Sequence, residues 1–264
     1  GALRYQIDGP FVDMVHCHCS MCRKHHGAPF ATWAVAPLSS FRWVGDTSTL
    51  ASYKSSEKGH REFCRVCGSV APLLDDAIGL AIAPAANLVD DPGIRPTKHM
   101  FVASKAGWYT ITDALPQYDE YPPEFGMPST PREPVAVTPG VTQGSCLCGD
   151  VGYEISTAPL RMFFCHCSRC RKGRSAAHTT NIFVPLEKFR FRHGEELVRD
   201  FPLPGARYFG VAFCSACGSD VPRLLPVVLP VHAVVKVDVY VPGCPPSADT
   251  IFYVLTELLA GRQP

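Results

Sequence analysis

The segment Cys165-His166-Cys167-Ser168-Arg169-Cys170-Arg171-Lys172 decides the interpretation of this sequence, because a copy of it stands 148 positions earlier. The copy reads Cys17-His18-Cys19-Ser20-Met21-Cys22-Arg23-Lys24. Cysteines at C-x-C and C-x-x-C spacing bring their sulfur atoms close enough to share one metal ion. Disulfide frameworks instead spread single cysteines through a small secreted chain. We therefore interpret the two cysteine triplets as metal ligands.

Paired cysteines accompany the triplets, and their neighbours support the same interpretation. The segments Cys64-Arg65-Val66-Cys67-Gly68-Ser69 and Cys214-Ser215-Ala216-Cys217-Gly218-Ser219 have the form of zinc-knuckle turns. The glycine after the second cysteine permits a positive φ, which lets backbone N–H groups point at sulfur. A further pair, Cys146 and Cys148, precedes the second triplet, whereas Cys244 matches no other cysteine and is expected to be a bystander thiol.

The duplication extends beyond the cysteine triplets. The shift of 148 also carries Tyr5 to Tyr153, and a shift of 150 carries Cys64 to Cys214, so an insertion of two residues lies between them. Six prolines between positions 122 and 139 indicate an extended linker between the repeats. We predict a first domain at residues 1–125, a linker at residues 126–139 and a second domain at residues 140–264.

The same shift, extended backwards, predicts one more cysteine pair. Cys146 and Cys148 would correspond to positions just before Gly1. Either the first repeat has lost this pair, or the protein begins earlier with a C-x-C that this sequence omits. We expect the second alternative, and sequence data for the full-length chain would check it.

The secondary structure is expected to be mainly β with little helix. Alternating patterns and short apolar runs predict strands at residues 3–7, 31–37, 80–83, 151–155 and 189–192. Short helices are expected at Ser20–His26, ended by Gly27, and at Ser168–Lys172. Apolar residues at helical spacing from Ile251 to Leu259 predict a terminal amphipathic helix.

The composition argues against several functional classes. The chain has 264 residues, with 25 Lys and Arg against 24 Asp and Glu, and a net charge of +1. Nucleic-acid binders usually carry a clear basic surplus, so we expect no nucleic-acid partner. No apolar run of about 18 residues occurs, so we expect no membrane partner and a soluble, cytoplasmic protein. The sequence does not indicate an oligomeric state.

The clustered cysteines of the second repeat are more than one tetrahedral ion needs. Four of them can close a shell of the kind that holds a structural zinc: Cys146, Cys148, Cys214 and Cys217. Three others remain: Cys165, Cys167 and Cys170. A set of three ligands with an open fourth position is typical of a catalytic metal.

Charge restricts the chemistry at such a triplet. Zn²⁺ with three thiolates carries about −1 overall, so it is a poor Lewis acid but can hold a substrate thiol as a nucleophilic thiolate. Four basic residues after the triplets could pair with carboxylates of an anionic thiol, or could be solvated surface charges: Arg23, Lys24, Arg171 and Lys172. Strand alternation points His18 and His166 away from the ion, so we expect them to pack rather than to ligate.

Together these motifs resemble the glutathione-dependent formaldehyde-activating enzyme family, which also includes centromere protein V. The matching segments are the two Cys-His-Cys-Ser-x-Cys-Arg-Lys stretches, the two Cys-x-x-Cys-Gly-Ser turns, residues 144–149 and, in the first repeat, residues 98–108. The resemblance covers nearly all of the first domain and the first part of the second. The second repeat lacks a clear counterpart of the block at residues 98–108.

The resemblance implies two tandem zinc-binding β-tent domains and carbon–sulfur lyase chemistry, in which the thiolate of glutathione adds to formaldehyde. The implied partners are therefore a small thiol and a small aldehyde. The implied catalytic zinc ligands are Cys17, Cys19 and Cys22 in the first domain and Cys165, Cys167 and Cys170 in the second. The implied structural zinc ligands are Cys146, Cys148, Cys214 and Cys217, and Cys64 and Cys67 with the predicted upstream pair.

Two other functions stay open at this point. The duplicated domains could form a non-catalytic zinc scaffold for a partner protein. The C-x-x-C pairs could also cycle to disulfides in a thiol-redox or metal-buffering role. The triplet that is kept in both repeats favours the enzyme, and the Gly-Ser flanks of the pairs argue against the redox role.

Overall fold

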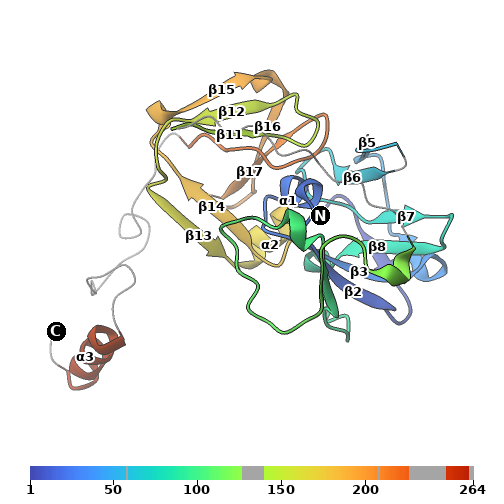
Figure 1. Cartoon of the computed structure of the whole chain (residues 1–264), viewed down its shortest axis with the longest axis horizontal. Coiled ribbons are helices and arrows are strands. Elements are labelled where there is room, and N and C mark those ends of the chain that lie inside the picture. Colours follow the sequence, from blue (N-terminus) through green and yellow to red (C-terminus); the bar gives the residue numbers. More distant parts are fainter. Residues whose placement is uncertain (58, 127–139, 207–208, 226–247, 262–264) are drawn as a thin grey trace. The chain divides into compact units, whose positions relative to one another are not determined.

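The computed structural model describes residues 1–57, 59–126, 140–206, 209–225 and 248–261. The chain forms two compact units, Gly1–Arg223 and Leu224–Pro264, and each is described by itself. The described part of the first unit consists of strands, turns and two short α-helices (Figure 1), so the predicted mainly β fold is confirmed.

The first repeat contains ten strands and one α-helix among its described residues. The strands are β1 (Tyr5–Ile7), β2 (Asp13–Cys17), β3 (Ala31–Pro37), β4 (Phe41–Trp43), β5 (Leu50–Lys54), β6 (His60–Cys64), β7 (Leu73–Asp75), β8 (Leu80–Pro84), β9 (Lys98–Met100) and β10 (Gln117–Tyr118). Helix α1 (Ser20–His26) follows β2 with the predicted bounds. Four 3-10 turns complete the repeat: η1 (Leu38–Ser40), η2 (Ala85–Asn87), η3 (Val102–Ser104) and η4 (Pro123–Phe125).

The described elements of the second repeat follow the same order. They are β11 (Thr142–Ser145), β12 (Gly152–Ile155), β13 (Arg161–Cys165), α2 (Ser168–Arg174), β14 (Thr179–Phe183), η5 (Leu186–Lys188), β15 (Phe189–His193), η6 (Glu195–Leu197), β16 (Val198–Pro202) and β17 (Gly210–Cys214). A shift of 148 carries β2, α1 and β5 onto β13, α2 and β16, whereas β6 needs a shift of 150 to reach β17. The predicted insertion therefore lies in the loop between β16 and β17.

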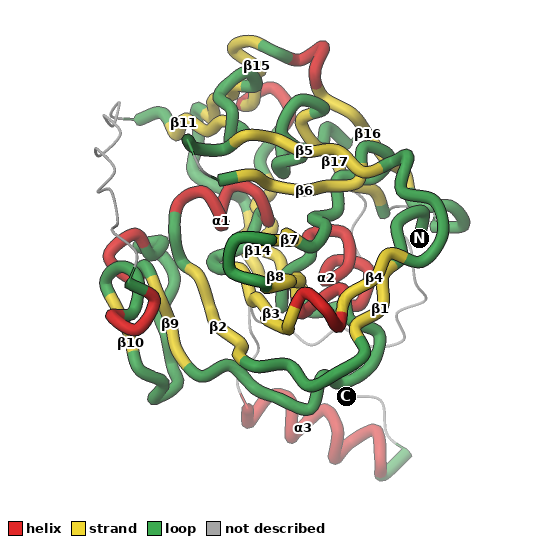
Figure 2. Tube along the Cα trace, turned by 90° about the vertical axis from the view of Figure 1, so that its right-hand side faces the viewer, coloured by secondary structure: helices red, strands yellow, loops and turns green. Residues whose placement is uncertain are grey.

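A six-stranded sheet forms the centre of the first repeat, in the order β10-β9-β2-β3-β8-β7. Figures 1 and 2 both show β2 beside β3, with which it pairs antiparallel. On its other edge β2 pairs in parallel with β9, which places Cys17 opposite Met100. Among the residues that the structure describes, β13 pairs only with β14. Strand β9 begins the block at residues 98–108, and the described part of the second repeat contains no strand that corresponds to it.

The two repeats pack against each other through reciprocal contacts. Gly68 lies against the ring of Phe213, and Gly218 lies against the ring of Phe63. A Cβ atom would stand 2.5 Å from the Phe213 ring at the first position and 2.3 Å from the Phe63 ring at the second. Both glycines have a φ of +72°. These positions therefore need glycine for the turn of the chain and for the close approach of the other repeat.

The two helices end in the same backbone conformation with different residues. Gly27 ends α1 at a φ of 57°, as predicted, and Ser175 ends α2 at a φ of 54°. The buried Ser175 side chain accepts a hydrogen bond from the Val70 N–H at 3.0 Å and another from Asn87 Nδ2 at 3.0 Å. A side chain at Gly27 would instead collide with the carboxylate of Asp220. The helix ends thus take part in the packing of one repeat on the other.

The second unit contains helix α3 (Ala248–Leu259), which confirms the predicted terminal helix. No helix in the described part of the chain is both long and apolar enough to cross a membrane. Residues 127–139 of the predicted linker, the segment 226–247 and Cys244 lie outside the described residues. The predicted boundaries of the two domains and the linker therefore stay a prediction.

Candidate metal centres

Four sulfur atoms come together in the second repeat, all within 4.8 Å of one another: those of Cys146, Cys148, Cys214 and Cys217. The first two cysteines follow β11 and the other two enclose the turn after β17, so a shared ion would join two hairpins. The Val151 N–H donates to Cys146 Sγ at 3.3 Å, and Tyr53 of the first repeat packs against this group. Three of the four cysteines are buried and Cys148 is partly exposed, and a residue of the first repeat contributes to their surroundings.

The sulfur atoms of Cys17, Cys19 and Cys22 also lie within 4.8 Å of one another. Cys17 ends β2, and the N–H of Cys22 in the first turn of α1 donates to Cys19 Sγ at 3.3 Å. Hydrogen bonds from Cys17 and Cys19 hold the pKa of the Cys22 thiol well below its ordinary value. Cys17 and Cys22 are each only 3% exposed, in an apolar cluster that includes Trp33 and Met100.

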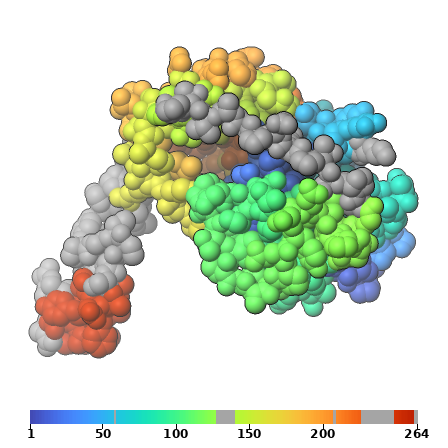
Figure 3. Space-filling view, viewed as in Figure 1, coloured from blue at the N-terminus to red at the C-terminus, as the bar shows by residue number. Residues whose placement is uncertain are grey.

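Residues from β9 to η4 cover this first triplet. Phe101, Tyr121 and Phe125 pack against its apolar cluster. Figure 3 shows their segment, coloured green, at the surface of the first repeat. These residues thus help to bury Cys17 and Cys22, whereas Cys19 stays partly exposed.

The third group consists of Cys165, Cys167 and Cys170, whose sulfur atoms again lie within 4.8 Å of one another. The Cys170 N–H donates to Cys167 Sγ at 3.4 Å, as in the first repeat. Cys167 is exposed, and the neighbouring Phe163 and Phe164 are 43% and 45% exposed. Because no described strand covers the outer edge of β13, the second triplet lies at the surface.

The three groups have the chemistry that a metal ion requires. Each contains a sulfur that accepts a hydrogen bond from a backbone N–H, which stabilises a thiolate. Four converging sulfur atoms suit a closed tetrahedral site, and three leave one position open. The cysteine residues therefore fit a bound metal at all three groups.

A guanidinium group that the sequence patterns did not indicate lies beside the first triplet. Arg61 lies in β6, and its Nη1–H donates to Cys22 Sγ at 3.8 Å. Its Nε atom is buried and has no hydrogen-bond partner among the described residues. Burial acts to lower the pKa of Arg61, but the charges of Cys22, Cys19 and Cys17 outweigh it and raise that pKa. The only signal in the sequence was that Arg61 aligns with Val211 in the second repeat.

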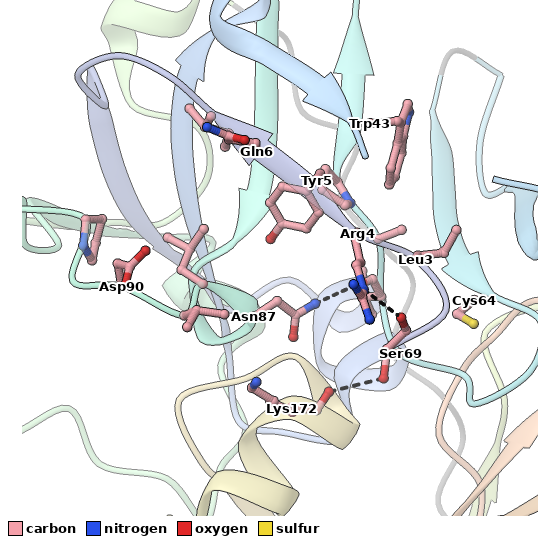
Figure 4. Close-up of a pocket in the computed structure, with 18 of the residues that line it drawn as sticks. Leu3, Arg4, Tyr5, Gln6, Trp43, Cys64, Ser69, Asn87, Asp90 and Lys172 are labelled. Atoms are coloured by element: carbon pink, nitrogen blue, oxygen red, sulfur yellow. Dashed lines mark hydrogen bonds between the residues drawn. The ribbon is translucent and has the colours of Figure 1, made fainter. Parts of the chain in front are cut away.

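Cys64 and Cys67 enclose the turn after β6. They line a cavity of about 720 Å³, together with Tyr5 of β1 and Lys172 of α2 (Figure 4). The Ser69 hydroxyl donates to the Lys172 carbonyl at 3.1 Å, so this wall also joins the repeats. Hydrogen bonds from the Cys67 thiol and from backbone N–H groups lower the pKa of Cys64 to about 5. The predicted upstream pair stays a prediction.

The four basic residues predicted to bind substrate have different surroundings. Lys24 Nζ donates to Ser145 Oγ at 2.7 Å, which joins α1 to the second repeat. Arg23 is partly buried, and burial lowers its pKa although the charge of Cys19 opposes this. Arg171 and Lys172 are exposed on α2. Their role in substrate binding stays a prediction.

Buried histidines lie near the first triplet, and a packing role was expected only for His18 among them. His18 Nε2 lies 2.9 Å from His99 Nδ1, and His99 Nε2 lies 3.1 Å from Asp113 Oδ1. Because a carboxylate only accepts, His99 Nε2–H donates to Asp113. His18 also packs against the ring of Phe30, which agrees with the packing role expected for it.

Two further histidines lie on α1 next to the triplet. His26 is buried, and its Nδ1–H donates to the carbonyl oxygens of Arg174 and Ser175 at 3.0 and 2.9 Å. His25 is 2% exposed and neither ring nitrogen has a hydrogen-bond partner among the described residues. Burial lowers the pKa of His25 to about 3. Both side chains are therefore neutral near pH 7.

The fold and these sites define a mainly β protein with three cysteine groups arranged for metal binding. The model of one family, glutathione-dependent formaldehyde-activating enzyme, matches residues 1–104 and residues 141–247. These two matches together span well over half of the chain. The chain belongs to this family.

Two further comparisons cover smaller parts of the chain. Over 43 residues the chain is 54% identical to the NAD-reducing hydrogenase HoxS subunit delta of Cupriavidus necator, which is 16% of this chain and 21% of that protein. The chain thus spans about a fifth of the length of this curated relative. A crystal structure of a Rhodobacter sphaeroides protein is 27% identical, with a TM-score of 0.28, over 36% of this chain and 85% of that one.

Proposed function

We propose that this protein is a zinc-dependent carbon–sulfur lyase of the S-(hydroxymethyl)glutathione synthase type. Its substrates would be a small thiol such as glutathione and a small aldehyde such as formaldehyde. Membership of the family supports glutathione-dependent chemistry on formaldehyde. The observation that supports the proposal is that the described residues contain two groups of three cysteine sulfur atoms and one group of four. Three sulfur ligands would leave one position of a tetrahedral ion open, and four would fill it.

The proposal assigns separate roles to the cysteine groups. The triplets Cys17, Cys19 and Cys22, and Cys165, Cys167 and Cys170, would each hold a catalytic zinc, and the group of four would hold a structural zinc. Zinc at a triplet would keep the substrate thiol in its thiolate form near neutral pH. The thiolate sulfur adds to the aldehyde carbon, so a C–S bond forms, the C=O π bond breaks and the oxygen takes up a proton.

The chain's own residues would bind and enclose the thiol. Arg23 and Lys24 in the first repeat, and Arg171 and Lys172 in the second, follow the triplets and would pair with carboxylates of glutathione. The Lys24 ammonium group would pair with such a carboxylate while it also donates a hydrogen bond to Ser145 Oγ. The apolar cluster around Met100 would keep water from the first triplet. We also propose a cytoplasmic location, because clustered cysteines that are not joined by disulfides are typical of metal sites in reducing compartments.

Cobalt substitution tests whether an open triplet binds a thiol. Glutathione added to the cobalt-loaded full chain should change the sulfur-to-cobalt absorption, because a fourth sulfur joins the ion. S-methylglutathione has the same charges but no thiol, and it should leave the spectrum unchanged. A spectrum that responds to no thiol would contradict the proposal and favour a non-catalytic zinc scaffold.

Magnetisation-transfer NMR with ¹³C-formaldehyde and glutathione tests the reaction itself. The protein should accelerate the exchange between formaldehyde hydrate and S-hydroxymethylglutathione above the spontaneous rate. An unchanged exchange rate with zinc-loaded protein would contradict the assigned reaction.

A further inference from the structure

The surroundings of the two triplets differ in charge. At the first triplet the Arg61 guanidinium donates to Cys22 Sγ at 3.8 Å. No carboxylate in the described part of the chain forms an ion pair with Arg61, so the cysteine is its hydrogen-bonding partner there. Its buried Nε–H is a further donor without a partner among the described residues. Arg61 therefore brings an uncompensated positive charge to the sulfur atoms.

The second repeat has no charge at the equivalent place. The shift of 150 that carries β6 onto β17 places Val211 where the first repeat has Arg61. Val211 is apolar and only 5% exposed. The strand register confirms the correspondence. Arg61 pairs with Tyr53 in β5, and Val211 pairs with Phe201 in β16. The two partners, Tyr53 and Phe201, are themselves related by the shift of 148.

This difference matters because a thiol ligand adds negative charge. A divalent ion with three thiolates carries about −1, and a fourth thiolate makes it about −2. An uncompensated buried charge is strongly unfavourable, and a nearby cation offsets that cost. Cys17 and Cys22 are each 3% exposed, so water compensates little at the first triplet. Water can compensate more at the exposed second triplet, but it also competes there for the open position.

We propose that Arg61 makes the first triplet the thiol-binding centre of this protein, because its guanidinium offsets the negative charge that a substrate thiolate adds at Cys17, Cys19 and Cys22. The inference rests on the proposed function. It adds that the first repeat binds the thiol and that Arg61 determines this binding. Arg61 acts through charge, so lysine at this position keeps part of the effect and a neutral side chain does not.

The test is a glutathione titration of the cobalt-loaded full chain, followed by sulfur-to-cobalt absorption. Arg61→Met should weaken glutathione binding on the order of ten-fold or more, and Arg61→Lys should weaken it less, because lysine keeps the positive charge. Arg65→Met is the matched control, because Arg65 is exposed on the turn after β6 and donates to the Leu50 carbonyl at 2.9 Å. This control should bind glutathione like the wild type.

Two further variants keep the test decisive. Arg61→Gln replaces Arg61→Met if the methionine variant does not fold, as judged by cobalt content and circular dichroism. The spectral response should also disappear in Cys22→Ser. Wild-type affinity in the neutral Arg61 variants, or a full response in Cys22→Ser, would overturn the inference and leave the proposed function standing. A wild-type protein without any thiol response would overturn both.

Discussion

His25 illustrates how burial sets the protonation state of a single side chain in this protein. The ring is 2% exposed, and burial lowers its pKa to about 3. An unfolded chain takes up a proton on histidine near pH 6.5. The folded state therefore binds fewer protons than the unfolded state below that pH. Its stability is fully present above pH 6.5 and is lost as the pH falls toward 3.

Replacing His25 should make the protein less sensitive to acid. One such histidine contributes up to about 1.4 kcal/mol of unfolding free energy per pH unit below pH 6.5. Urea denaturation of His25→Gln at pH 6.5 and pH 5.5 should therefore show a smaller loss than the wild type by about 1 kcal/mol. His60→Gln, at an exposed position of β6, is the control. Equal losses in His25→Gln and the wild type would contradict the burial argument.

Distance along the chain decides which site residues the sequence could predict. Cys17, Cys19 and Cys22 form their group through a strand end and one helical turn, so their spacing predicts it. Arg61 reaches Cys22 from a separate hairpin, and nothing in the spacing of the two residues indicates this contact. His18 and His99 meet because β9 pairs in parallel with β2, which local patterns do not predict either.

At the scale of elements, α2 ends at Ser175, a residue with a side chain in a left-handed backbone conformation that normally favours glycine. Ser175 has a φ of 54°, where glycine is usual, and its buried hydroxyl accepts from Val70 and Asn87 across the repeats. Ser175→Ala should therefore cost about 1–3 kcal/mol of unfolding free energy, because buried donors lose their partner. Thermal or urea denaturation measures this cost, with the exposed Ser39→Ala as control. A Ser175→Ala variant as stable as that control would contradict the role of the hydroxyl.

Element bounds were predictable where the pattern is local. The bounds of α1 and β3 match the sequence-based expectation, because a cysteine cap, a glycine end and an apolar run define them. The sequence alone did not place the two-residue insertion in a particular loop. The structure places it between β16 and β17. The six-stranded sheet was not predictable, because β9 joins β2 from more than eighty residues along the chain.

At the scale of the molecule, the repeats depend on each other through their knuckle glycines. Gly218→Ala should lower the unfolding free energy by about 2–4 kcal/mol, since its Cβ would meet the Phe63 ring and its φ is positive. Gly79→Ala is the matched control, with a φ of +68° and no atom within 4 Å of the added Cβ. Equal losses of unfolding free energy for the two variants would show that only backbone strain contributes, and would contradict the packing contact.

The sequence predicted the duplication, but it could not predict which surfaces of the repeats meet.

The two kinds of cysteine group should respond differently to substitution. Cys217→Ser opens the group that joins two hairpins and should lower the stability of the zinc-loaded protein by several kcal/mol. Cys170→Ser alters a triplet that lies at the surface and joins no second hairpin, so it should lower stability much less. Thermal denaturation with zinc present measures both. Equal and small effects would contradict the division into structural and open sites.

The most direct test of the account is an anomalous-difference map at the zinc edge from crystals of the zinc-loaded full chain. We predict zinc bound by four sulfur atoms at Cys146, Cys148, Cys214 and Cys217. We also predict zinc with three protein sulfur ligands at Cys17, Cys19 and Cys22, and at Cys165, Cys167 and Cys170. Triplets joined by disulfides, or triplets without metal in crystals where the group of four retains it, would contradict the account.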